Sequence, residues 1–176
     1  IPASKENLKI NIEGGADFGK WAPPTDHIKN VLLPLLDKMN YNSYINIKKY
    51  GFYPKGGSAA EFFSDKCNLK PIKIIEKGKI LSINGISVAS SLLKKAQVSE
   101  RQAETAKKIL FKRFDIIPKI KPIYDNSLCP GSGIQLWITT ENSVLGSNAL
   151  GELGKKSELV GEEAANNLIF EYENGC

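Results

Sequence analysis

The chain has 176 residues, of which 41% are hydrophobic and 24% charged, a balance typical of a globular protein with one ordinary domain or two small ones. No apolar run approaches the roughly 20 residues that a membrane-spanning helix needs, and no secretory signal pattern is present, so we expect no membrane partner. The formal net charge of +5 is compatible with a phosphate-bearing partner, but it is too small to identify one.

The three cysteines are odd in number, far apart and not arranged as a CxxC pair; they are Cys67, Cys129 and Cys176. This pattern argues against a disulfide framework and against a zinc site, and it favours a reducing, cytoplasmic location. The chain starts at Ile1 rather than at methionine, so we expect a processed or trimmed polypeptide.

Hydrophobic periodicity predicts the elements of the first part of the chain. Alternation over residues 8–12 predicts a strand, and an apolar stripe at helical spacing over residues 28–39 predicts a helix. Thr25 or Asp26 is expected to cap this helix, and Pro34 to bend it without ending it, because the stripe continues past the proline. Further strands are predicted over residues 44–49, 58–64 and 71–75.

The second part opens with a predicted strand over residues 80–90. A helix is expected from Ser99, because Ser99 and Gln102 match the capping-box pattern. The remaining predicted elements are strands over residues 120–124, 134–140 and 144–148 and a helix over residues 157–172.

The alternation of strands and helices predicts an α/β (α+β) fold in which helices pack on a sheet face. We expect two small units of comparable size, residues 1–76 and residues 77–176.

A glycine-containing loop at residues 54–58 is the most specific local feature. Gly56 and Gly57 leave the backbone bare, so that its amides can approach phosphate oxygens closely, and Lys55 supplies a positive charge. The alternative is a tight hairpin turn between two strands, with no ligand.

A second loop, residues 14–24, runs from a strand to a helix N-terminus, where unpaired amides attract anions. It begins with Gly14 and Gly15, but it is neither a Walker A loop nor a GxGxxG motif. The flat faces of Trp21, Pro23 and His27 are suited to sandwiching a base; the alternative is that these side chains only pack the loop down.

His27 is the only histidine. Positive charge on it is disfavoured in the first turn of a helix, so we expect a neutral ring used for packing or stacking. Without a second histidine the chain holds no Ser/His/Asp set. The residues alone therefore identify no catalytic group.

Residues 50–58 resemble the signature of RNA 3′-terminal phosphate cyclases, a basic residue followed by G-x-x-P-x-G-G-G. Tyr50 replaces the usual Arg or His, and Ser58 replaces the third glycine. The resemblance covers nearly the whole chain in order, and its later part has an archaeal character. The other matching stretches are residues 13–17, 22–26, 31–36, 70–78, 99–103 and 151–165.

The resemblance implies an enzyme that uses ATP and a divalent metal, Mg or Mn, to convert an RNA 3′-phosphate into a 2′,3′-cyclic phosphate through a histidine adenylate. It implies a large domain of repeated βαβ-type units with a small α/β domain inserted. Residues 1–76 then correspond to part of the large domain, and residues 77–176 to the insert. The partners implied are ATP and RNA with a 3′-phosphate end, and the oligomeric state stays open.

The same resemblance implies that the nucleophilic histidine lies beyond Cys176, so that this chain carries no catalytic residue and no metal ligand. His27 falls where the family often has an aromatic residue beside the adenine. The expected nucleotide-binding residues are Pro23, Pro24, Asp26 and His27. The expected phosphate or RNA loop residues are Gly14, Gly15, Lys55, Gly56 and Gly57.

Two other functions stay open. The family includes a cyclase-like member that has lost catalysis and acts as an RNA-binding protein in ribosome assembly, and the departures at Tyr50 and Ser58 are compatible with it. A relative by fold, an enolpyruvate transferase, is opposed by the G-x-x-P-x-G-G match.

Overall fold

The computed structural model describes residues 6–175, and helices and strands alternate along them, which confirms the α/β class. The first part contains β1 (Leu8–Glu13), the helical segment α1 (Thr25–His27), η1 (Ile28–Leu32) and α2 (Leu33–Asp37), then β2 (Ser43–Lys49) and β3 (Ala59–Ser64). The second part contains β4 (Ile80–Ser90), η2 (Ser91–Ala96), α3 (Val98–Phe114), β5 (Lys119–Asp125), β6 (Ser132–Thr140), β7 (Val144–Leu150) and α4 (Ser157–Asn174). Among residues 6–175, no helix is long and apolar enough to cross a bilayer.

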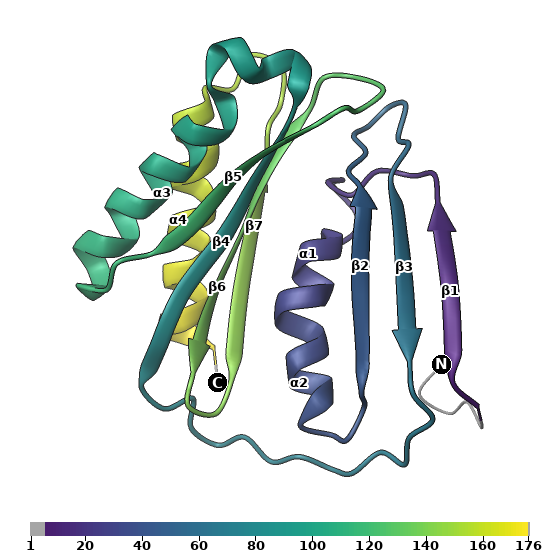
Figure 1. The fold of residues 1–176 in the computed structure, drawn as a ribbon. Coiled ribbons are helices and arrows are strands. Elements are labelled where there is room, and N and C mark those ends of the chain that lie inside the picture. The colour runs from purple at the N-terminus through teal and green to yellow at the C-terminus, as the bar shows by residue number, and fades with distance from the viewer. Residues whose placement is uncertain (1–5, 176) are drawn as a thin grey trace.

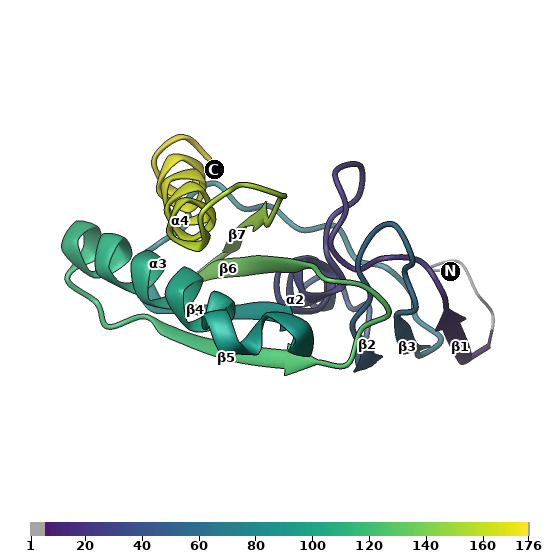
Figure 2. The same ribbon diagram turned by 90° about the horizontal axis from the view of Figure 1, so that it is seen from above.

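The strands form two sheets with a helical segment between them (Figure 1). The smaller sheet is antiparallel, in the order β1-β3-β2. The larger has the order β5-β4-β6-β7, with β4 and β5 parallel and joined by the crossover through α3. Helices α3 and α4 cover one face of the larger sheet, and α1–η1–α2 lies on its other side (Figures 1 and 2).

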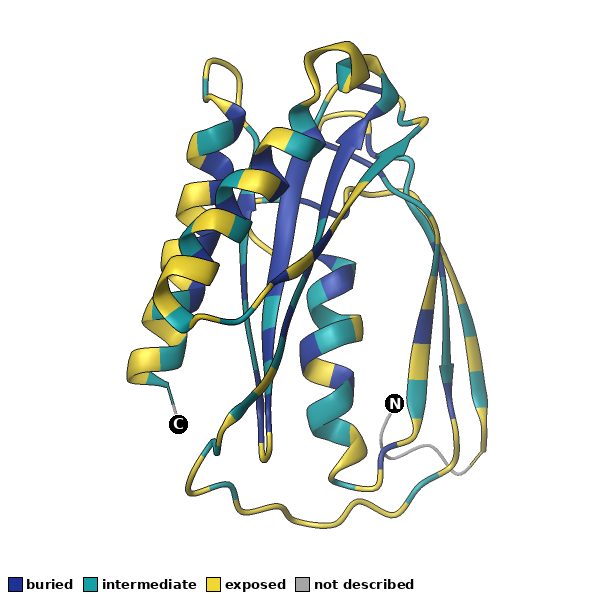
Figure 3. Cartoon of the chain, turned by 60° about the vertical axis from the view of Figure 1, so that its left-hand side comes forward, coloured by how far each residue is buried: buried dark blue, intermediate teal, exposed yellow. Residues whose placement is uncertain are grey.

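Strand β6 is one of the two central strands of the larger sheet and is buried along most of its length (Figure 3). Ile134, Leu136 and Ile138 have no exposed surface and belong to the main apolar cluster with α3 and α4. Because side chains alternate along a strand, the odd-numbered residues of β6 face the opposite way, toward the first part of the chain. Gln135 is therefore placed toward α1.

The first helical segment continues past Pro34, as expected. The turn before the proline is π-helical: the Leu33 amide donates to the Ile28 carbonyl oxygen. The expected cap is wrong. Pro24 is the N-cap residue, no side chain caps the helix, and the Thr25 hydroxyl donates to Asp17 instead.

Two further local predictions are wrong. No strand forms over residues 71–75, because no described strand lies beside them; Ile75 is 72% exposed. The expected capping box is absent as well. Helix α3 begins at Val98, and the side chains of Ser99 and Gln102 form hydrogen bonds outside the helix. Ser99 Oγ donates to the Ser87 carbonyl oxygen, and Gln102 contacts the hydroxyls of Ser87 and Ser132.

A small apolar cluster joins the two parts of the chain. Phe18 and Phe52, from the two loops of the first part, pack with Val88 and Cys129 of the second part, and all four are buried. The two rings stack with their centroids 6.2 Å apart. Both loops are therefore held against the larger sheet.

Helices α3 and α4 are in close contact at Gly161, and this contact generates a stability prediction. A Cβ at Gly161 would clash with the Gln102 carbonyl oxygen. Although alanine is the better helix former by about 1 kcal/mol, overpacking against backbone costs up to about 3 kcal/mol. Gly161→Ala should therefore lower the free energy of unfolding by about 2 kcal/mol, measured by urea denaturation.

The matched control is Gly19→Ala, since a Cβ at Gly19 meets no atom within 4 Å. It should leave the urea midpoint nearly unchanged. Equal midpoints for the two variants would contradict the close helix contact.

Candidate functional site

The two glycine loops predicted from the sequence lie side by side. The Gly14 amide donates to the Ser58 carbonyl oxygen at 2.9 Å, and the Ser58 amide donates to the Gly15 carbonyl oxygen at 3.3 Å. The Ser58 hydroxyl adds a 2.6 Å hydrogen bond to the Gly14 carbonyl oxygen. Serine at this position therefore ties one loop to the other.

The glycines at this contact are required by backbone geometry. Gly56 has φ of +64°, and a Cβ there would clash with the Gly15 carbonyl oxygen. The Gly14 and Gly56 amides already donate to the carbonyl oxygens of Ser58 and Phe52. These two amides are therefore occupied within the chain. Of the two exposed lysines of the loops, Lys20 pairs with Glu152, and Lys55 is the one placed beside Gly56 and Gly57.

Asp17 links the two loops through hydrogen bonds. Its carboxylate accepts from the Thr25 hydroxyl at 2.5 Å and from the Gly51 amide at 2.9 Å. Its own amide donates to the Gly51 carbonyl oxygen. Burial raises the pKa of the Asp17 carboxyl, which is only 7% exposed. A buried acid thus links the start of the helical segment to the loop after β2.

Tyr50 connects two more carboxylates. Its hydroxyl donates to Asp26 Oδ2 at 2.8 Å, and its amide donates to Asp125 Oδ2 at 2.7 Å. Asp26 is 1% exposed, and its Oδ1 has no hydrogen-bond partner among the described residues. Burial raises the pKa of Asp26, and burial together with the nearby Asp26 raises that of Tyr50. The hydroxyl of Tyr50 thus satisfies one of the two oxygens of a buried acid.

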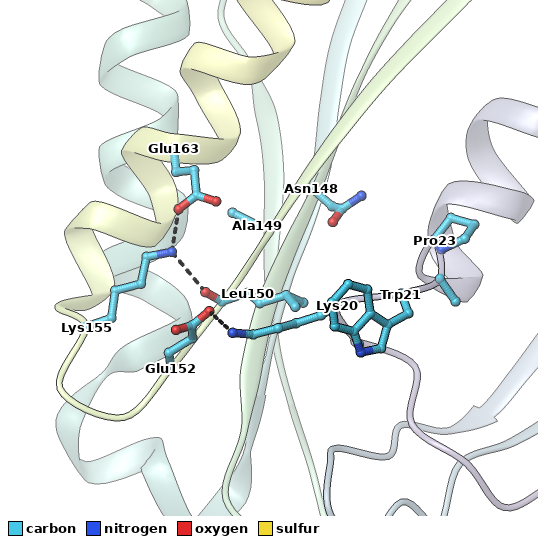
Figure 4. Close-up of a pocket in the computed structure, with 11 residues that line it drawn as sticks. Lys20, Trp21, Pro23, Asn148, Ala149, Leu150, Glu152, Lys155 and Glu163 are labelled. Carbon is cyan, nitrogen blue, oxygen red and sulfur yellow. Dashed lines mark hydrogen bonds and ion pairs between the residues drawn. The ribbon is translucent and has the colours of Figure 1, made fainter.

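A pocket of about 640 Å³ opens beside the loop of residues 14–24 and the end of β7 (Figure 4). Pro23 and Trp21 stand on one side of it, and Trp21 is 96% exposed. Lys20 pairs with Glu152 at 3.2 Å, and Lys155 pairs with Glu163. The pocket combines an exposed aromatic face with side chains of both charges.

The four expected nucleotide-binding residues do not share one surface. Only Pro23 lines the pocket and is exposed. Pro24 and Asp26 are buried, so in this structure they support the helix start and present no surface to a ligand. His27 is partly buried, and its Nδ1 lies 3.2 Å from Gln135 Nε2. Their binding role stays a prediction, and burial counts against direct contact by Pro24 and Asp26.

Burial lowers the pKa of the His27 imidazole, which favours the neutral ring expected from its place in the helix. Its only described hydrogen-bond neighbour is the Gln135 amide. No carboxylate of residues 6–175 is hydrogen-bonded to the ring to orient it as a general base or nucleophile requires.

Within residues 6–175, no group of three or more His, Cys, Asp or Glu side chains is placed to hold a metal ion. We therefore derive no step through a metal from these residues.

Sequence reasoning missed Asp17, Asp125 and Gln135. Asp17 lies in a stretch that resembles the family, but no local pattern assigned it a role, and Asp125 lies in no matching stretch. Gln135 carries the one available signal, because it is a polar residue in a strand whose neighbours are apolar.

Titration of Asp26 should be visible in the stability of the chain. Because burial raises its pKa above the ordinary 3.8, the folded chain keeps a proton that the unfolded chain releases. This stabilisation of the folded chain is fully present below pH 3.8, and it is lost as the pH rises through the raised pKa of Asp26. Asp26→Asn removes this titration and keeps an oxygen for the Tyr50 hydroxyl. The free energy of unfolding should therefore fall less between about pH 4 and about pH 7 in the variant.

Asp37→Asn, which removes an exposed carboxylate from the same helical segment, is the control. Urea denaturation at a series of pH values measures all three proteins. The same pH dependence in wild type and Asp26→Asn would count against a raised pKa.

Comparison with known proteins gives the family. The family described as RNA 3′-terminal phosphate cyclase (RTC), insert domain, matches residues 75–173. A protein of Ignicoccus hospitalis named RNA 3′-terminal phosphate cyclase is 38% identical over 174 residues, covering 96% of this chain and 48% of the relative. Proteins of the same name are 41% identical over 164 residues in Thermococcus gammatolerans and 39% over 173 residues in Pyrococcus abyssi.

These two matches cover 91% and 98% of this chain, and 46% and 49% of the relatives. The chain thus spans about half the length of the curated relatives it matches. The family match and these identities agree with the resemblance of residues 50–58 to the cyclase signature. The chain belongs to the RNA 3′-terminal phosphate cyclase family.

Proposed function

We propose that the whole protein to which this chain contributes converts the 3′-terminal phosphate of RNA into a 2′,3′-cyclic phosphodiester, with ATP as co-substrate, through an adenylate on a histidine. The observation that carries this proposal is the family match over residues 75–173, together with relatives named RNA 3′-terminal phosphate cyclase. The adjacent glycine loops supply a surface at which a phosphate end can be held.

The nucleophilic histidine belongs, in this proposal, to polypeptide beyond Cys176. His27 is unsuited to the role because its Nδ1 is engaged by the Gln135 amide nitrogen and no carboxylate among the described residues orients the ring. The chain instead contributes binding surface. Residues 1–76 form part of the large domain, and residues 77–176 form the insert.

The exposed ring of Pro23, at the wall of the pocket, is the proposed contact for the adenine of ATP. His27, four residues on and outside the residues that line the pocket, is the proposed second contact through the exposed part of its ring. The buried Pro24 and Asp26 hold the helix start in place. Lys55, beside Gly14, Gly15, Gly56 and Gly57, is the proposed cation for a phosphate group of the RNA. We assign no described residue to the Mg or Mn ion expected from the resemblance.

The non-catalytic alternative is not favoured. The relatives described above are all named as cyclases. The two departures that supported the alternative have structural explanations, since Ser58 ties the glycine loops together and Tyr50 donates a hydrogen bond to Oδ2 of the buried Asp26.

The 176-residue chain alone should neither form a cyclic end on RNA bearing a 3′-phosphate nor become labelled by ATP carrying a radioactive α-phosphate, because the proposed nucleophile is absent from it. Thin-layer chromatography of the RNA and autoradiography of the protein measure both reactions. The whole protein is the positive control and should become labelled. Label on His27 of the short chain would overturn this assignment.

In the whole protein, Pro23→Ala should raise the KM for ATP about fivefold and leave the KM for RNA nearly unchanged. Loss of roughly 40 Å² of apolar contact corresponds to about 1 kcal/mol of binding free energy. The control is Pro122→Ala, an exposed proline in β5 at the opposite edge of the larger sheet from β7. Equal increases for ATP and RNA would argue against the adenine contact.

A further inference from the structure

Gln135 is a buried polar residue on the face of β6 that looks toward α1, with no exposed surface. Its Nε2 lies 2.9 Å from the Leu136 carbonyl oxygen and 3.2 Å from His27 Nδ1. One nitrogen of the larger sheet thus contacts the only histidine of the chain.

The orientation of this amide follows from its neighbours. A carbonyl oxygen accepts hydrogen bonds and never donates them, so the group facing the Leu136 oxygen must be the NH₂ of Gln135. The second N–H of that NH₂ is directed to His27 Nδ1. A ring nitrogen that accepts carries no proton, so the His27 proton sits on Nε2.

The other end of the amide supports this reading. Gln135 Oε1 has no hydrogen-bond partner among the described residues. A buried oxygen without a partner is unfavourable, so the contacts of the nitrogen side, and not those of the oxygen, hold the side chain in its orientation.

The neighbouring strand leaves little room for the ring to move. A Cβ on Gly146 of β7 would lie 3.2 Å from His27 Cε1, 3.2 Å from Gln135 Nε2 and 2.5 Å from Val31 Cγ2. Only the bare backbone of glycine fits against the ring, the amide and Val31 together. β6 and β7 therefore contact the Nδ1 and Cε1 edge of the imidazole, while the ring as a whole is only partly buried.

We propose that Gln135 is a positioning residue: it holds His27 as the neutral Nε2–H tautomer, so that the ring offers a hydrogen-bond donor to an acceptor atom of the bound nucleobase. The inference rests on the proposed function for the identity of the ligand, but not for the state of the ring. It gives residues 77–176 a direct role in shaping the nucleotide contact. The His27–Gln135 contact crosses the boundary between the two proposed units.

The state of the ring is tested by NMR of the chain with ¹⁵N-labelled histidine, because His27 gives the only imidazole signals. At about pH 8, where the imidazole is neutral, the Nε2 resonance should be of the protonated type and the Nδ1 resonance of the unprotonated, hydrogen-bonded type. A wild-type ring protonated at Nδ1 would overturn the proposal.

The decisive variant is Gln135→Glu, because a carboxylate accepts where the amide donates. The ring proton should move to Nδ1, and the two ¹⁵N resonances should exchange character. Gln97→Glu makes the same chemical change at an exposed site and should keep the wild-type pattern. Should Gln135→Glu fail to fold, Gln135→Met should still weaken the hydrogen-bond shift at Nδ1. Unchanged resonances in every folded variant would refute the positioning role.

The functional consequence is measured in the whole protein. Gln135→Met should raise the KM for ATP about fivefold, the effect of a weakened hydrogen bond, with kcat at saturating ATP and the KM for RNA nearly unchanged. If the wild type is active and Gln135→Met has the same KM for ATP, the nucleotide role of Gln135 is refuted. A wild type without cyclase activity would instead refute the proposed function, and the NMR result would then decide the state of His27 by itself.

Discussion

The packing of two phenylalanine rings against bare backbone is the contact on which the rest of the site depends. A Cβ on Gly133 would clash with the Phe18 ring, and one on Gly131 would clash with the Phe52 ring. Both rings are almost fully buried, so each loop of the first part is pressed onto the second part of the chain. Because the loops meet at this contact, their glycines lie side by side and α1 begins next to the larger sheet.

This packing encloses polar groups, and their hydrogen bonds make the contact specific. Apolar rings fix a distance but tolerate sliding, whereas the Asp17 carboxylate accepts from Thr25 and Gly51 only in one relative placement of the loops. The cost is a set of buried acids with raised pKa values, Asp17 and Asp26. Tyr50 reduces this cost because its hydroxyl donates a hydrogen bond to Asp26. A buried carboxylate without such a donor would be strongly unfavourable.

Local periodicity was sufficient for most of the fold, and it failed where a partner elsewhere in the chain decides the outcome. Residues 134–140 and 157–172 carry strong patterns and form the expected strand and helix within a few residues. Residues 71–75 are apolar enough for a strand, but a strand also needs a neighbour to pair with, and none of the described strands supplies one. Ser99 and Gln102 fit a local cap, yet tertiary hydrogen bonds to Ser87 and Ser132 take their side chains.

The same distinction separates what could be predicted of the site from what could not. Gly14 and Gly56 were singled out as bare backbone in loops, which is a local feature of the sequence, and the structure shows that both have positive φ. Asp17, Asp125 and Gln135 act through contacts between segments distant in sequence, and no local rule identifies such partners. Gln135 nonetheless shows what to look for. In a strand buried on both faces, an apolar residue would serve packing alone, so a glutamine there indicates a polar partner on the facing element, and here that partner is His27.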